Sequence, residues 1–331
     1  MDFIARIRSR ARAMRPRIAF PEAGDPRILA AVDVLRRERI VEPVLIADRQ
    51  TSASWDRELR EAVEILDPER DPRRGRLEAH LLAVRSEKGM THAEAARLSG
   101  DRLLFADDLV HHGDVAGCVA GCITTTADVI RAALWLVGPA AGVRTVSSAF
   151  YMVTPPFRGT ASEVLTFTDC AVVPYPTPEQ LADIAIAAMR DRRRIVGDEP
   201  IVALLSFSTR GSAEGDSVTR VRMALAMLQR RAPELRVDGE LQADAALIES
   251  VALRKAPASP AAGVANVLVF PDLDAGNIAY KLVERLARAS AIGPVMQGLA
   301  KPCSDLSRGA SPDDIINTAA VTALQTQDVG G

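Results

Sequence analysis

Short apolar runs alternate with longer segments of helical period along this chain of 331 residues. This alternation is typical of a largely parallel sheet covered by helices. The first repeat is an expected strand at 17–21 (RIAFP), followed by a helix that starts at Asp25-Pro26 and continues through Leu35. Proline is favoured in the first turn of a helix, which supports that start. We therefore predict an α/β fold.

Further strands are expected wherever an apolar run is bounded by polar or turn residues. These runs lie at 43–47, 115–120, 143–150, 165–168, 200–207, 235–237, 265–270 and 289–293. The last five of them predict a second sheet. We expect helices between 48 and 110, where the charged run 67–76 is interpreted as a solvated turn. The proline-rich stretch 154–158 (TPPFR) is the expected crossing between two domains, because paired prolines break both helix and strand.

Composition and charge exclude several classes of function. The formal charge is −2 and aromatic residues make up 4% of the chain, so neither nucleic acid nor an anionic membrane is an expected partner. The longest apolar stretch, 132–143, is interrupted by Gly138 and Pro139 and is shorter than the roughly 20 residues that a bilayer needs. The arginine-rich N-terminus lacks the apolar region of a signal peptide.

The cysteines and histidines indicate the cellular compartment that we expect and argue against a metal site. The four cysteines are too few and too scattered for a disulfide framework, which favours a reducing cytoplasm. Neither these nor the histidines complete a familiar zinc spacing, so no metal site is expected. The cysteines are Cys118, Cys122, Cys170 and Cys303, and the histidines are His80, His92, His111 and His112.

The chemistry must then come from polar turns that lead from a strand into a helix. The sequence contains none of the common Walker A, G-x-G-x-x-G, G-x-S-x-G or H-E-x-x-H motifs. Backbone N–H groups at a helix start bind anions, and hydroxyls and arginines add donors. The first such turn contains Thr125 and Thr126 and is followed by Arg131. The alternative is that its threonines only cap the helix.

Two more turns of this kind follow expected strands in the second half of the chain. One contains Ser206, Ser208 and Ser212, and the other ends at Asn277 with Lys281 further along its helix. Ligands of open α/β sheets collect at the carboxyl ends of strands, where both turns would lie. Each of them is alternatively a polar turn without a ligand.

The segment 301–314 combines the most specific set of groups. It holds Ser307 and Arg308 beside a glycine, with Asp314 six residues later. These residues supply a hydroxyl, a fixed cation and a base. The alternative for Asp314 is structural, since Ser311-Pro312-Asp313-Asp314 before an apolar run resembles a capping box.

Many segments in order resemble the family of phosphate acetyltransferases and phosphate butyryltransferases. The matching segments include RIAFPEAGDPRILAA from 17, TTADVIR from 125, LLSFSTRGSA from 204, VFPDLDAGNIAYK from 269 and DLSRGASPDDI from 305. The resemblance implies two three-layer α/β/α domains of the isocitrate and isopropylmalate dehydrogenase type with the active-site cleft between them. It assigns 1–153 and 296–331 to the first domain and 154–295 to the second.

The resemblance also implies the reaction: reversible transfer of an acetyl group between coenzyme A and inorganic phosphate, by direct thiol attack in a ternary complex. The expected enzyme is a cytoplasmic homodimer that has no tightly bound cofactor and no catalytic metal. Its substrates are coenzyme A, acetyl phosphate and phosphate. The implied catalytic residues are Asp314, Ser307 and Arg308, and the implied substrate-binding residues are Arg85, Arg131, Thr125, Thr126, Ser206, Ser208 and Ser212. Asn277 and Lys281, from the turn described above, are further candidates for substrate binding.

These residue types suit that chemistry. A thiol with a pKa near roughly 8.5 needs a base, and Asp314 serves only if its own pKa is raised or the thiol is made more acidic. Arginines bind phosphate bidentately and remain charged, and we expect the three arginines to converge on one anion pocket beside Asp314. Ser307 donating to the acyl carbonyl contributes about 2–4 kcal/mol to the transition state.

Other functions remain open on the residues alone. Thr124, Ala132, Val173-Pro174 and Ala243 depart from residues common in the family, which leaves the acyl-chain preference between acetyl and butyryl open. A non-catalytic domain that senses coenzyme A or an acyl phosphate is a second alternative. A dehydrogenase lacks a nucleotide motif here, and Cys303 as an acyl carrier lacks a neighbour that would lower its pKa.

Overall fold

The computed structural model describes residues 2–159 and 162–327. These residues form two compact units: 2–141 with 299–327 make up unit 1, and the described part of 142–298 makes up unit 2. The sequence placed the boundaries at 153/154 and 295/296. The difference at the first boundary arises from strand β5 (Ser147–Thr154), which pairs with two strands of the second sheet and so belongs wholly to unit 2.

The sheet of unit 1 is parallel throughout and has the strand order β11-β4-β1-β2-β3. Its strands are β1 (Arg17–Phe20), β2 (Glu42–Ile46), β3 (Glu64–Leu66), β4 (Gly117–Ala120) and β11 (Cys303–Asp305). The expected strands at 17–21, 43–47 and 115–120 are confirmed with shifted ends. The pattern missed β3 and β11, which have three residues each. β11 returns the C-terminal segment to this sheet beside β4.

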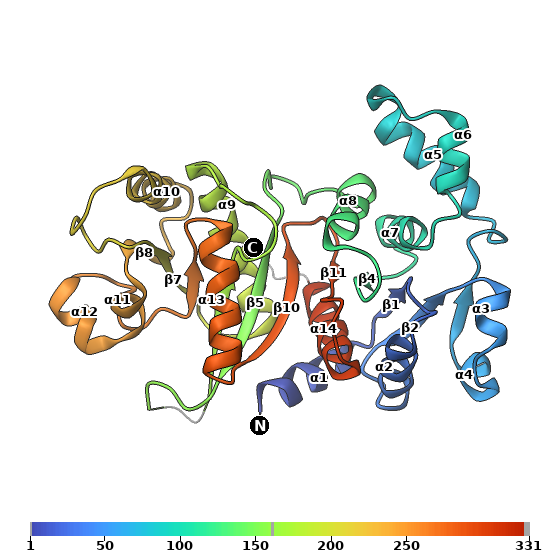
Figure 1. Ribbon diagram of the computed structural model, residues 1–331, viewed down its shortest axis with the longest axis horizontal. Helices are drawn as coiled ribbons and strands as arrows, with labels where there is room; N and C mark the ends of the chain where they lie inside the picture. The colour runs from blue at the N-terminus through green and yellow to red at the C-terminus, as the bar shows by residue number, and fades with distance from the viewer. Residues whose placement is uncertain (1, 160–161, 328–331) are drawn as a thin grey trace. The chain divides into compact units, whose positions relative to one another are not determined.

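Helices cover both faces of this sheet (Figure 1). One side carries α7 and α8, which contact each other, and the other carries α2 and α14. The helices of the unit are α1 (Phe3–Met14), α2 (Pro26–Arg37), α3 (Arg49–Ala53), α4 (Arg57–Ala62), α5 (Arg74–Arg85), the 3-10 helix η1 (Ser86–Lys88), α6 (His92–Leu98), α7 (Arg102–His112), α8 (Thr126–Leu136) and α14 (Pro312–Gln325). Asp25 caps α2 by accepting a hydrogen bond from the Arg27 N–H, as expected for that start.

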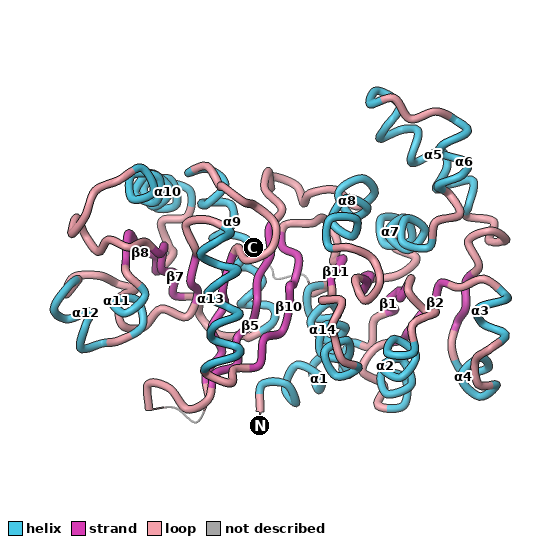
Figure 2. The backbone as a smooth tube through the Cα atoms, in the orientation of Figure 1, coloured by secondary structure: helices cyan, strands magenta, loops and turns pink. Residues whose placement is uncertain are grey.

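The sheet of unit 2 is mixed and has the order β10-β5-β6-β9-β7-β8, with β5 antiparallel to both neighbours. Figure 2 shows its strands between helices. The further elements are β6 (Glu163–Thr168), β7 (Ile201–Leu205), β8 (Arg236–Leu241), β9 (Val267–Val269), β10 (Ser290–Gln297), α9 (Pro178–Ile195), α10 (Asp216–Arg231), α11 (Ala243–Leu247), α12 (Glu249–Lys255) and α13 (Leu273–Leu286). The stretch 154–158 is not the crossing between domains that its prolines predicted: Thr154 ends β5, and 155–158 belong to the connection between the antiparallel strands β5 and β6 inside this unit.

Strand β7 shows why unit 2 has three layers. Its side chains alternate between two cores, as the period of a strand requires. Val202 and Leu204 pack with α9 and α10, whereas Ala203 and Leu205 pack in the core that α13 covers. Both faces are therefore apolar and both need helices. No helix in the described part of the chain is long and apolar enough to cross a membrane.

Candidate active site

The carboxyl ends of β4 and β11 carry the loops that the sequence singled out in unit 1. The two strands are parallel neighbours, so both loops leave the same edge of the sheet. One loop comprises 121–125 and leads into α8, and the other comprises 306–311 and leads into α14. Parallel pairing thus brings together segments that are about 180 residues apart in the chain.

Glu22 organises the first of these loops. Its buried carboxylate accepts hydrogen bonds of 2.7–2.9 Å from four successive backbone N–H groups. The donors are Gly121, Cys122, Ile123 and Thr124. All four N–H groups already donate to Glu22, so they are not available as donors to a substrate phosphate.

Arg27 fastens the two loops to each other. Its guanidinium donates to the carbonyl oxygens of Arg308 at 2.7 Å, Ala310 at 3.1 Å and Cys122 at 3.0 Å. The remaining donors bind Asp25, and the Arg27 hydrogen bond lowers the pKa of that carboxyl. Because the guanidinium is planar and rigid, it defines the separation of the three carbonyls. The backbone at Arg308 is thereby held in place.

Asp305 and Thr126 join the loops a second time. The Thr126 hydroxyl donates to Asp305 Oδ2 at 2.7 Å. Burial raises the pKa of Asp305 to about 6, against the lowering effect of the Thr126 bond. A Cβ at Gly121, where φ is +114°, would lie 2.5 Å from Asp305 Oδ1 and from the backbone of Leu306. Only glycine therefore allows the loops to approach this closely.

Ser307 and Arg308 lie exposed on the second loop. The Ser307 hydroxyl accepts a hydrogen bond of 3.3 Å from the Gly309 N–H. The Arg308 side chain is exposed while its backbone carbonyl is bound by Arg27. This combination of a fixed backbone and an accessible guanidinium suits an anion site.

Asp314 adopts the capping geometry that was its structural alternative. Its Oδ2 accepts from both the N–H and the hydroxyl of Ser311 at 2.8 Å, and its own N–H donates to the Ser311 hydroxyl at 3.2 Å. The capping box is complete and exposed. A part in proton transfer for Asp314 stays a prediction.

The other two predicted arginines are occupied by partners on α8. Arg131 Nη1 bonds Asp128 Oδ1 at 2.6 Å, and Thr125 caps α8 through the same aspartate. The Arg85 guanidinium lies 4.4 Å from the centre of the Trp135 ring. Trp135 is four residues after Arg131, which is about 6 Å further along the helix axis. Residues four apart share one face of a helix, so both contacts lie on the same face of α8. Convergence of these two arginines with Arg308 on one anion pocket stays a prediction.

In unit 2 the serines of the 206–212 turn bond one another and the chain. Ser208 is fully buried and donates to Glu240 Oε1 at 2.9 Å, and the Ser206 hydroxyl accepts from the Ser208 N–H. The Ser212 hydroxyl accepts from the Thr209 N–H at 2.9 Å. The predicted hydroxyls therefore shape the turn itself.

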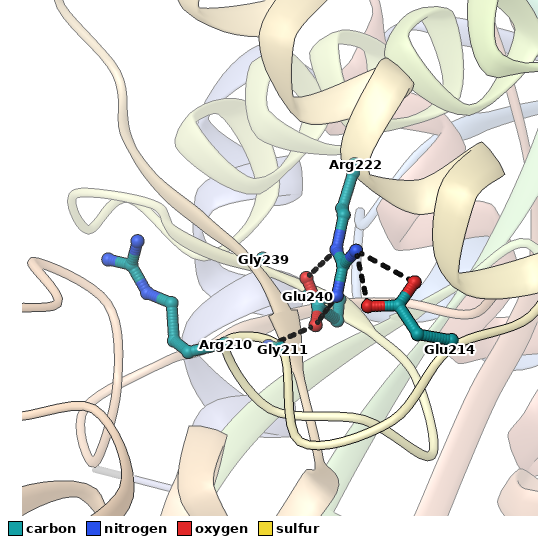
Figure 3. Close-up of a pocket in the computed structure, with 6 residues that line it drawn as sticks. All are labelled: Arg210, Gly211, Glu214, Arg222, Gly239 and Glu240. Carbon is teal, nitrogen blue, oxygen red and sulfur yellow. Dashed lines mark hydrogen bonds and ion pairs between the residues drawn. The ribbon is translucent and has the colours of Figure 1, made fainter.

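A shallow pocket of about 400 Å³ lies beside this turn (Figure 3). Glu240 accepts from Arg222 and from the Gly211 N–H there, and Glu214 bonds the other side of Arg222. Burial opposes ionisation of Glu240, but these hydrogen bonds lower its pKa to about 2. Arg210 bonds Asp238 at 2.6 Å. Both arginines of the pocket are thus already paired with carboxylates.

Asn277 and Lys281 help to hold α13 against the rest of unit 2. Asn277 Nδ2 donates to the Cys170 carbonyl at 3.1 Å, and Lys281 donates to Asn277 Oδ1 at 2.7 Å. A Cβ at Gly276 would lie 2.3 Å from the Asp169 carbonyl. The helix therefore packs tightly on the loop that follows β6, and a substrate contact for either predicted residue stays a prediction.

A sequence model of the phosphate acetyl/butaryl transferases matches residues 2–323. The chain belongs to this family. The phosphate acetyltransferase of Thermoanaerobacterium thermosaccharolyticum is 43% identical over 329 residues, which cover 99% of this chain and 100% of that protein.

Solved structures support both the family and the fold. A phosphotransacetylase from Streptococcus pyogenes matches with a TM-score of 0.89 at 35% identity, covering 98% of this chain and 99% of the other. A 4-hydroxythreonine-4-phosphate dehydrogenase from Klebsiella pneumoniae matches with a TM-score of 0.52 at 14% identity over 94% of this chain and 100% of its own, which shows the fold alone. The dehydrogenase-type α/β architecture expected from the resemblance is confirmed.

Sequence reasoning missed four residues that hold the loops of the candidate site in place. Glu22, Arg27, Asp305 and Glu240 each hold segments that are distant in the chain. The signal that the sequence offered for Glu22 was its position directly after the expected strand 17–21. The structure also gathers three histidines, His80, His111 and His112, that the spacing rules had dismissed.

Proposed function

We propose that this protein catalyses the reversible transfer of an acetyl group between coenzyme A and inorganic phosphate. The observation that carries the proposal is the family membership at 43% identity over the full chain. The fastened loops at the ends of β4 and β11, which present Ser307 and Arg308, support it. Small-molecule substrates agree with a formal charge of −2 and an aromatic content of 4%.

In this mechanism Arg308 binds the phosphoryl group of acetyl phosphate and stabilises the charge that develops on it. Its loop is held through the Arg27 contact to its carbonyl, so little ordering remains when the anion binds. The Ser307 hydroxyl donates to the acetyl carbonyl oxygen. Arg131, Arg85 and Thr125 contribute further donors when the Asp128 and Trp135 contacts are exchanged for substrate. The Thr126 hydroxyl does so when its bond to Asp305 is exchanged as well.

Asp314 accepts the thiol proton of coenzyme A. The thiolate sulfur then attacks the acetyl carbon, a C–S bond forms, and the bond from the acetyl carbon to the phosphate oxygen breaks to release phosphate. Both capping bonds use Oδ2, which makes Oδ1 the oxygen that we assign to the proton. No covalent enzyme intermediate and no resident cofactor takes part. Burial raises the pKa of Cys303 well above its ordinary value, which argues against a Cys303 acyl carrier.

The direct test follows release of the free thiol from acetyl-CoA. Release that requires inorganic phosphate and yields acetyl phosphate supports the proposal. Comparing kcat/KM for acetyl-CoA, propionyl-CoA and butyryl-CoA separates an acetyl from a butyryl preference. Binding of coenzyme A with no phosphate-dependent release from any of the three esters overturns the proposal in favour of a sensing domain.

We also propose that the enzyme is a homodimer in the cytoplasm. Helix α13 supports the first part, since Ile278, Leu282 and Leu286 are 57%, 52% and 79% exposed along one stripe of the helix. A second copy of the chain covering this stripe would remove it from water. The four free and buried cysteines support a reducing compartment.

A further inference from the structure

A cluster of three imidazoles lies on the surface of unit 1. His80 belongs to α5, and His111 and His112 end α7, a helix that contacts α5. One ligand atom from each ring lies within 4.8 Å of the other two. The ring centres of His80 and His111 are 4.4 Å apart, and those of His111 and His112 are 4.8 Å apart. Sequence spacing concealed the group because its members come from separate helices.

A buried carboxylate orients two of these rings. Asp108 is 0% exposed, and its Oδ1 lies 2.8 Å from His80 Nδ1. His112 Nδ1 lies 3.0 Å from the backbone carbonyl oxygen of Asp108 and 3.3 Å from its Oδ1. Carboxylate and carbonyl oxygens only accept hydrogen bonds, so in the neutral rings each Nδ1 carries the proton and each Nε2 keeps its lone pair. Carboxylates in this position are typical partners of metal-binding histidines, because they define the tautomer and raise the basicity of the ligand.

The charges around the cluster permit a dication. Arg76 bonds the other oxygen of Asp108 at 3.1 Å and Asp114 at 2.5 Å, and Lys301 donates to the His111 carbonyl at 2.9 Å. Two carboxylates thus offset two cationic side chains.

We propose that His80, His111 and His112 form a binding site for a divalent transition-metal ion of the Zn²⁺ type. Three imidazoles with an open fourth position are a known zinc set, and in tetrahedral geometry with Zn–N bonds near 2.0–2.1 Å the nitrogens lie about 3.3 Å apart. The exposed His111 and His112 side chains close the remaining distance by rotating. The bound ion cross-links α5 to α7, and none of its ligands belongs to the acetyl-transfer machinery.

The experiment uses the full chain with any affinity tag removed, because a polyhistidine tag would itself bind metal. Chelator-treated protein is titrated calorimetrically with Zn²⁺, and Co²⁺ absorption reports the coordination geometry. His111→Ala removes a ligand that bonds neither Asp108 oxygen, and His112→Gln removes a different one. His92→Ala is the matched control, since His92 is the remaining histidine and lies outside the cluster.

We expect the wild type and His92→Ala to bind one Zn²⁺ per chain and to melt at higher temperature with the ion. His111→Ala and His112→Gln lose at least tenfold in affinity and show no such rise. All four proteins should retain acetyl transfer in chelator, which separates this proposal from the proposed function. Absence of saturable binding to the wild type, or equal binding by the wild type and both ligand variants, overturns the proposal.

Discussion

At the scale of single residues, Glu22 is the side chain on which the site loop depends most. Replacement by Gln keeps the size but turns an amide NH₂ toward N–H donors and removes a charged acceptor. Hydrogen bonds to charged groups contribute about 1.5–3 kcal/mol each, so we expect Glu22→Gln to destabilise the protein by about 2–4 kcal/mol and to lower activity. Urea unfolding and the thiol-release assay measure both effects. The exposed Glu42→Gln variant should change the unfolding midpoint little.

Asp314 has two roles to separate, capping and proton transfer. If Asp314 is the base, its replacement reduces kcat by roughly 10²–10⁴-fold and spares the KM for coenzyme A. As a cap, its replacement costs about 1 kcal/mol of stability and leaves turnover intact. We expect Asp314→Asn to show the kinetic loss in steady-state assays, with the exposed neighbour variant Asp313→Asn as control. Full turnover of Asp314→Asn would return the residue to capping alone.

Asp305 makes stability depend on pH. Burial raises its folded-state pKa from 3.8 to about 6. Its folded form therefore binds a proton more tightly than the unfolded chain, and this contribution is complete below pH about 4 and is lost as pH rises to about 6. Asparagine does not titrate, so the Asp305→Asn variant does not lose this stability as pH rises. Its free energy of unfolding relative to the wild type should therefore increase by up to about 3 kcal/mol from pH 4 to pH 7. Thermal melts at four or five pH values check this; a pH-independent difference contradicts it.

At the scale of elements, the contact between the β4 and β11 loops depends on Gly121. Gly121→Ala places a Cβ at 2.5 Å from Asp305 and Leu306 and strains a φ of +114°, so the loops must separate. We expect at least tenfold lower kcat/KM together with reduced stability. Gly138→Ala has a φ of +71° with nothing within 4 Å, and it isolates the backbone strain from the contact. Equal activity of the two variants would show that the approach of the loops does not matter.

Elements also show how far the hydrophobic pattern predicts local structure. The start of α2 at Asp25-Pro26 was readable because capping and proline geometry are local. Strand β11 was not, because its sequence, Cys303-Ser304-Asp305, has no apolar run. Ser304 and Asp305 are buried there only because Thr322 and Thr126 supply hydrogen bonds from two helices. Such partners are invisible along the chain.

At the scale of the whole molecule, the exposed stripe of α13 bears on assembly. Leu282→Glu introduces a charge in the centre of this stripe, and we expect the proposed dimer to dissociate into monomers. Light scattering measures the resulting change in molar mass. Leu253→Glu is the control, since Leu253 is also 64% exposed but lies on α12. A wild-type monomer, or a dimer unaffected by Leu282→Glu, contradicts this assignment of the face.

The sequence alone determined the α/β class, the family and the segments that carry serine, arginine and threonine beside one another, since apolar period, caps and ordered motifs are local properties of the chain. Tertiary structure decided which of those groups are engaged. Glu22 meets its four N–H donors, Arg27 its three carbonyls and Asp108 its two imidazoles only after distant segments pack. Burial and partner geometry, which control pKa and hydrogen bonding, are properties of that packing.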